Sequence, residues 1–222
     1  MPQVVVLKMY HGFMKNYTYL VVDPSSRQAV IIDPAWQMEI IEQALIEAQA
    51  SLSGVLITHS HHDHVHLSNP VAEKYKCPIW MSKEEIEDSG FRARQLVGID
   101  PTPWAIGRML IEPILTPGHT PGCMCYLITD NLFTGDVLFA EGCGICPDIE
   151  AAHEMFASLE NLKNRIGPQT RIYPGHSYGK SPGQPMGRLL KENVYLQFPT
   201  RESFAAFRLR GGQDITKMFN FC

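Results

Sequence analysis

Five of the nine histidines in this chain lie within eight consecutive residues, in the segment THSHHDHVH that begins at Thr58. Imidazole nitrogens and carboxylate oxygens are ligands that zinc and iron accept in proteins. Residues two apart on an extended segment project to the same side, so His59 and His61 can bind one ion together. Asp63 and His64 come at the turn into the next helix, where they can point at a neighbouring ion. The spacing therefore predicts a metal site rather than a solvated histidine-rich loop.

Three further segments each place one possible ligand at the end of an expected strand. They are TPGHTPG with His119, LFTGD with Asp136 and IYPGH with His176. Ligand sites in α/β architectures are often assembled at strand ends. A metal held by these side chains could serve a hydrolytic reaction, provided that one coordination position is left to water.

These segments need a framework that brings them together. β-Branched and aromatic runs predict strands at 3–9, 16–23, 28–34, 53–59, 77–82, 108–115, 123–129, 131–139 and 170–176. Apolar residues at helical spacing and the flanking turn residues predict helices at 36–50, 65–76, 83–90, 150–166, 184–196 and 200–209. Residues 90–107 are expected to form a long excursion over the surface. Strands and helices mix without a strict βαβ order, which favours two mixed sheets flanked by helices.

Length and composition predict a single domain over 1–222, with a short helical C-terminal extension at about 184–222. There is no run of Lys and Arg for nucleic acid and no apolar stretch of the roughly 18 residues that a membrane span needs. The N-terminus does not resemble a secretion signal, so we expect a cytoplasmic protein with six reduced cysteines. The pair in CGIC has redox spacing but no second pair beside it.

The segments THSHHDH, PGHTPG, FTGD and YPGH, in this order, resemble the metallo-β-lactamase superfamily, and FTGDVLFAEGCG is most similar to its glyoxalase II-like branch. The resemblance implies an α/β fold in the form of a four-layer αββα sandwich, with the metals between the sheet edges. It also implies a ligand set: His59, His61 and His119 for a first metal, Asp63, His64 and His176 for a second, and Asp136 bridging both. His62 is expected to point away from the site. The role of His66 is open, because relatives usually have glycine there.

The resemblance implies two zinc ions, although the same ligands also take iron or manganese. Paired metals lower the pKa of bound water, and Asp63 is expected to orient the resulting hydroxide. Asp33 in VIIDPA matches the family aspartate that braces the metal loop from outside. A thiolate leaves readily without acid assistance, so hydrolysis of an acyl thioester is the expected reaction.

The expected thiol carrier follows from a departure from the glyoxalase II pattern. Those enzymes have, after GCG, a lysine near the substrate, where this chain has Ile145, so the resemblance implies that Ile145 contacts the substrate. Tyr178 matches a tyrosine that contacts substrate. The segments YHGFMKNYTYLVVD and FAEGCGICPD resemble zinc hydrolases of bacterial trans-acyltransferase polyketide clusters of the bacillaene type, which make antibiotics. This resemblance implies acyl groups on a carrier protein or pantetheine as substrate.

Four alternatives stay open from the sequence. The first is a hydroxyacylglutathione hydrolase, and the others are a persulfide dioxygenase with one iron, a lactonase, and a metal-stabilised binding protein without turnover. The sequence indicates neither the acyl group nor an oligomeric state.

Overall fold

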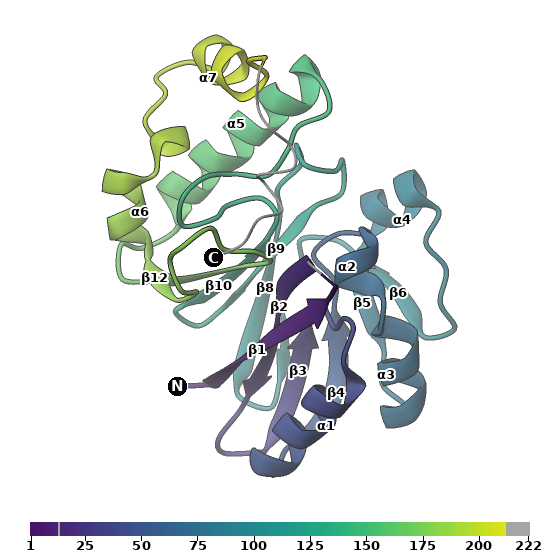
Figure 1. Ribbon diagram of the computed structural model, residues 1–222. Helices are drawn as coiled ribbons and strands as arrows, with labels where there is room; N and C mark the ends of the chain where they lie inside the picture. Colours follow the sequence, from purple (N-terminus) through teal and green to yellow (C-terminus); the bar gives the residue numbers. More distant parts are fainter. Residues whose placement is uncertain (13, 212–222) are drawn as a thin grey trace.

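The computed structural model describes residues 1–12 and 14–211, which form two six-stranded sheets with helices on both outer sides (Figure 1). In spatial order, the first sheet contains β1 (Gln3–His11), β2 (Met14–Val22), β3 (Gln28–Ile32), β4 (Ser51–Leu56), β5 (Ile79–Ser82) and β6 (Leu96–Ile99). The second contains β12 (Gln184–Pro185), β11 (Arg171–Pro174), β10 (Asn131–Gly135), β9 (Met124–Ile128), β8 (Met109–Leu115) and β7 (Trp104–Ile106).

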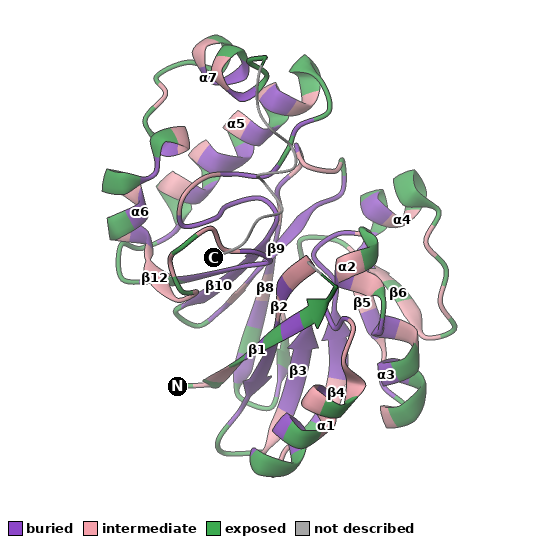
Figure 2. Cartoon of the chain, viewed as in Figure 1, coloured by how far each residue is buried: buried purple, intermediate pink, exposed green. Residues whose placement is uncertain are grey.

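The helices form two outer layers. The first sheet carries α1 (Met38–Glu47), α2 (His62–Val65), α3 (Ser68–Tyr75) and α4 (Lys83–Ser89). The second carries α5 (Ile149–Arg165), α6 (Met186–Glu192), the 3₁₀ turn η1 (Val194–Leu196) and α7 (Arg201–Arg208). The layers follow from alternation along the strands: in β2, Tyr19 and Val21 face the other sheet, whereas Leu20 and Val22 pack towards the helices. Figure 2 shows the resulting buried strands and the exposed outer helix faces. The predicted αββα sandwich is confirmed.

Strand direction decides where the candidate ligands meet. The pairs β3–β4 and β10–β11 are parallel, so both members of each pair end at the same edge of their sheet. Asp33 follows β3 and His59 follows β4, while Asp136 follows β10 and His176 follows β11. The polar ends of four strands are thereby gathered at one end of the sandwich.

One local prediction was wrong, and one helix begins later than predicted. Residues 90–107 do not only cross the surface, because they include β6 and β7, the edge strands of the two sheets. These strands have four and three residues and pair on one side only, so they lack the long apolar run that marks a central strand. The helix expected at 65–76 is α3, which begins only at Ser68, and the short helix α2 precedes it. Residues 212–222 of the predicted C-terminal extension lie outside the described residues.

Within the part of the chain that the structure describes, no helix has the length and apolar composition to cross a membrane.

Candidate metal centre

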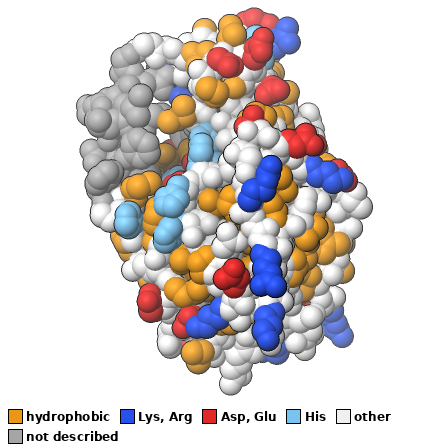
Figure 3. Space-filling model, turned by 90° about the vertical axis from the view of Figure 1, so that its right-hand side faces the viewer, with side chains coloured by type: hydrophobic (Ala, Val, Ile, Leu, Met, Phe, Trp, Pro, Cys, Tyr) orange, Lys and Arg blue, Asp and Glu red, His pale blue; other side chains and the backbone are white. Residues whose placement is uncertain are grey.

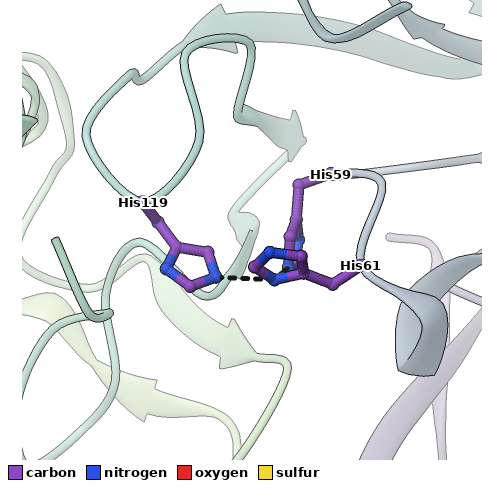
Figure 4. A group of neighbouring side chains, drawn as sticks. All are labelled: His59, His61 and His119. Atoms are coloured by element: carbon purple, nitrogen blue, oxygen red, sulfur yellow. Dashed lines mark hydrogen bonds between the residues drawn. The ribbon is translucent and has the colours of Figure 1, made fainter. Parts of the chain in front are cut away.

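Three histidines from two distant segments direct ring nitrogens at one point (Figure 4). The Nε2 atom of His59 lies 3.0 Å from Nδ1 of His61, which in turn lies 3.0 Å from Nε2 of His119. Tetrahedral zinc with Zn–N bonds of about 2.0–2.1 Å would hold such nitrogens roughly 3.3 Å apart. The three-histidine group therefore has nearly the spacing that a zinc ion requires.

A second group lies beside the first. Asp63 and His64 come from α2, and His176 follows β11, with one ligand atom of each within 4.8 Å of the others. The Asp63 Oδ2 atom is 3.2 Å from Nε2 of His176 and 3.6 Å from Nε2 of His64. Asp136 lies between the groups, because its carboxylate is 3.5 Å from Nε2 of His64 and 3.7 Å from Nε2 of His119. The structure thus brings all seven predicted ligand residues together.

Hydrogen bonds on the outer side fix how two of these imidazoles are protonated. The Nδ1 atom of His119 donates to the carbonyl oxygen of Ile145 at 2.8 Å, and Nδ1 of His176 donates to that of Lys15 at 2.8 Å. A carbonyl oxygen only accepts, so the hydrogen must be on Nδ1 and the Nε2 lone pair faces the centre. Histidine ligands of metals are typically oriented in this way.

Asp33 orients two more rings, as its place in the sequence suggested. Its Oδ2 atom accepts from Nδ1 of His64 at 2.9 Å and from the Thr58 hydroxyl at 2.7 Å, and Oδ1 accepts from the Thr58 N–H at 2.8 Å. Because the Thr58 hydroxyl donates to Asp33, it accepts from Nδ1 of His59 at 3.1 Å. One buried carboxylate thereby directs Nε2 of His59 and of His64 inwards.

The electrostatics of the two groups differ. Burial and the neighbouring imidazoles hold the pKa of His59 well below its usual range, which favours the neutral form that binds metals. Burial also acts to lower the pKa of His64, but Asp136, Asp63 and Asp33 outweigh it and raise that pKa to about 10. The carboxylate-rich half of the centre therefore favours a positive charge on or near His64.

Two buried atoms in this half have no hydrogen-bond partner among the described residues, namely His64 Nε2 and Asp136 Oδ1. Buried polar atoms without a partner are uncommon in native proteins. A cation between them would satisfy both, so the residues present fit a metal ion on this evidence as well.

The remaining histidines of the cluster have other contacts. His62 belongs to none of the candidate ligand groups; its ring packs 5.4 Å from the Trp36 indole and 5.1 Å from the His66 ring, and the residue also lines a cleft over the centre. The Nδ1 atom of His66 accepts a hydrogen bond from the backbone N–H of Trp36 at 3.2 Å, and the His66 ring packs 4.9 Å from the Trp36 indole. His66 thus fastens the loop that follows β3, a role that no local signal in the sequence indicates.

Asn16 is a residue that the sequence reasoning missed. It is 2 % exposed, and its side chain donates to the carbonyl oxygen of Asp63 at 2.6 Å. The Trp36 indole N–H donates to the Asn16 side-chain oxygen at 2.5 Å. The hairpin of β1 and β2 is thereby tied to the metal-binding loop. The one available signal was a polar residue at the start of the apolar run NYTYLVV.

A cleft of about 340 Å³ opens over the centre. Its walls include the apolar side chains of Met14, Phe139 and Ile145 together with Tyr178, whose ring packs 5.3 Å from that of Phe139. Among the described residues that line this cleft, none is Lys or Arg. Figure 3 shows histidine side chains gathered on one face with hydrophobic side chains beside them. The two predicted substrate-contacting residues, Ile145 and Tyr178, both lie in this cleft.

Gly175 gives a steric test of the centre. A Cβ atom there would lie 2.5 Å from His64 Cε1 and 2.6 Å from Asp136 Oδ1. We expect Gly175→Ala to displace both side chains, at a cost of about 1–3 kcal/mol in stability, and to reduce bound zinc measured by plasma mass spectrometry. Gly142→Ala is the control, because its Cβ would meet only the Tyr195 ring at 3.5 Å. Equal zinc content in both variants would contradict this geometry.

The comparisons with known proteins agree with the fold and the cluster. Residues 11–176 match the metallo-beta-lactamase superfamily. The chain is 46% identical over 209 residues to the "Probable polyketide biosynthesis zinc-dependent hydrolase BaeB" of Bacillus velezensis, covering 93% of each chain. It is 33% identical over 186 residues to the "Probable hydroxyacylglutathione hydrolase" of Schizosaccharomyces pombe, covering 81% of this chain and 70% of that protein.

Solved structures show the same fold. A metallo-beta-lactamase from Staphylococcus aureus superposes with a TM-score of 0.83 at 22% identity, covering 95% of this chain and 67% of that one. ETHE1 from Myxococcus xanthus superposes with a TM-score of 0.80 at 27% identity, covering 92% and 89%. Fold, motif order and sequence similarity coincide over most of the chain, which therefore belongs to the metallo-β-lactamase superfamily.

Proposed function

We propose that this protein is a binuclear zinc hydrolase that cleaves acyl thioesters, with acyl groups on the pantetheine arm of a carrier protein as substrates in polyketide biosynthesis. The observation that carries the proposal is a largely apolar cleft, with no Lys or Arg in its described lining, directly over a cluster of seven histidine and aspartate side chains. The similarity to BaeB, which is named as a probable zinc-dependent hydrolase of polyketide biosynthesis, supports it.

In this proposal the two groups hold one ion each. His59, His61 and His119 would bind the first, Asp63, His64 and His176 the second, and Asp136 would contact both; iron or manganese could replace zinc. Zinc supplies a nucleophilic water at neutral pH and polarises a carbonyl group. The Asp63 carboxylate, whose Oδ2 atom lies 3.2 Å from Nε2 of His176, would orient that water. Tyr178 and Ile145 would contact the thiol carrier at the cleft wall.

The cleft wall favours a pantetheine arm over glutathione. Each charged hydrogen bond that a dianionic tripeptide lost would weaken binding by about 1.5–3 kcal/mol. The described lining offers no Lys or Arg for such bonds, and Ile145 occupies the position of the glyoxalase II lysine. A neutral pantetheine chain would lose none of these interactions.

Hydroxyacylglutathione hydrolysis is the second candidate. Tyr178 lies in the cleft and matches a tyrosine that contacts substrate in that branch. The similarity to the Schizosaccharomyces pombe protein supports the same activity. If it is the true activity, the charged groups of glutathione must be bound by residues other than the described cleft lining.

Thiol release from three substrates tests the proposal. We expect a zinc-loaded enzyme to release thiol fastest from an acylated carrier protein, more slowly from the same acyl group on coenzyme A, and least from lactoylglutathione. An Asp136→Ala preparation serves as the control for contaminating esterases. Preference for lactoylglutathione would identify the second candidate, and no release from any thioester would contradict thioesterase activity.

A further inference from the structure

Glu85 is a buried carboxylate that lies behind the three-histidine group. It comes from the first turn of α4, and its side chain is 0 % exposed. No salt bridge to Glu85 occurs among residues 1–12 and 14–211. A buried carboxylate without a cation has to be stabilised by hydrogen-bond donors. The identity of these donors indicates what Glu85 does.

The donors come from the two segments that carry the three histidines. Oε1 of Glu85 accepts from the backbone N–H of Ser60 at 2.7 Å. Oε2 accepts from the hydroxyl of Thr120 at 2.5 Å and from the N–H of Gly122 at 3.2 Å. Ser60 separates His59 from His61 in the chain, and Thr120 directly follows His119. One carboxylate therefore connects the backbones of both ligand segments.

The first turn of α4 and the second segment also fit closely. The hydroxyl of Ser82, the N-cap residue, accepts from the Glu85 N–H at 3.0 Å and donates to the Gly122 carbonyl at 2.5 Å. A Cβ atom on Gly122 would lie 2.0 Å from the Glu85 nitrogen, so only glycine permits this approach. The segment that carries His119 is thus docked onto the helix by backbone contact and by three hydrogen bonds.

We propose that Glu85 is a positioning residue that sets the distance between His119 and the pair His59–His61, so that the three-histidine site exists before an ion binds. The proposal rests on the ligand assignment in the proposed function, but it does not depend on the substrate. The ligand segments are about sixty residues apart, and their relative position must be held by contacts outside the ligands themselves. Glu85 makes such contacts with both of them.

Glu85→Gln tests this role in the full chain. Glutamine has the same shape, but it offers one acceptor oxygen and turns an N–H₂ group towards donors. We would titrate the metal-free protein with Co²⁺, follow the visible absorption bands, and then displace Co²⁺ with zinc. The expected result is a loss of about 10- to 100-fold in affinity at the three-histidine site, with altered bands. The site of Asp63, His64 and His176 should keep its affinity within about twofold.

Glu84→Gln is the matched control, because Glu84 is the exposed neighbour on the same helix and should bind both ions like the wild type. Thr120→Val removes one of the three hydrogen bonds while keeping the side-chain shape, so it should cause a smaller loss at the same site. Unchanged affinity in Glu85→Gln, or equal weakening of both sites, would overturn the proposal. If Glu85→Gln does not fold, unchanged metal affinity at the three-histidine site of Thr120→Val would overturn the proposal. A wild type that binds both ions but cleaves no thioester would refute the proposed function alone.

Discussion

Asp136→Ala is expected to reduce thioester hydrolysis by about 10³-fold, because it removes a carboxylate that faces both ligand groups. The carboxylate lies 3.5 Å from His64 Nε2 and 3.7 Å from His119 Nε2. It is also the strongest of the charges that raise the pKa of His64. Several kcal/mol of transition-state stabilisation depend on paired ions, and each 1.36 kcal/mol corresponds to about tenfold in rate. We would measure kcat/KM together with zinc content.

Asp130→Ala provides the control for this substitution. Asp130 is an exposed aspartate immediately before β10, whereas Asp136 immediately follows the same strand. We expect Asp130→Ala to keep its zinc and its turnover. An Asp136→Ala protein that bound two zinc ions and retained turnover would refute the assignment of Asp136 as the shared ligand.

Asp33→Asn is expected to lower zinc affinity by about 10- to 100-fold, although Asp33 is not a proposed ligand. The carboxylate accepts three hydrogen bonds, two from Thr58 and one from His64. Asparagine has a single acceptor oxygen, so at least one buried donor would lose its partner at a cost of about 1–3 kcal/mol. The rings of His59 and His64 would no longer be held in orientation by the same carboxylate. Equilibrium dialysis against zinc would measure the effect.

Asp23→Asn separates loss of metal binding from general destabilisation. Both aspartates are 2 % exposed, follow a strand and precede proline. Asp23 accepts from the N–H groups of Ser25 and Arg108, at a turn away from the metal centre. We expect Asp23→Asn to lower thermal stability and to leave zinc affinity unchanged. Equal losses of zinc affinity in the two variants would mean that Asp33 acts only through stability.

The sequence was sufficient to predict that the seven histidine and aspartate side chains lie together, because each motif places a possible metal ligand near a strand end. Parallel pairing of β3 with β4 and of β10 with β11 then brings these ends together. The short strands β6 and β7 were missed, since edge strands lack the long apolar run of central ones. Contacts between distant segments, such as that of His66 with Trp36, depend on tertiary packing and leave no periodic signal.

Glu85 illustrates the same limit within the candidate site. In KEEIEDS it resembles its neighbours Glu84 and Glu87, and a charged run on a short helix usually faces solvent. Only the packing of α4 against the segment with His119 makes it different. The main-chain carbonyl of Ile145, which orients His119, could not have been found from residue type at all.

The proposed ligands belong to both halves of the sandwich, which has a consequence for the lifetime of the protein in a cell. His59 to His64 follow strands of the first sheet, whereas His119, Asp136 and His176 follow strands of the second. Ions bound between the two halves would stabilise the folded state, by about 4 kcal/mol per site when the ion concentration is 1,000 times the dissociation constant. His176 is the last proposed ligand in chain order. The second site is therefore complete only after most of the chain has been synthesised, and its ion would bind after that point. The zinc concentration would then affect both the resistance of the protein to proteolysis and its rate of substrate turnover.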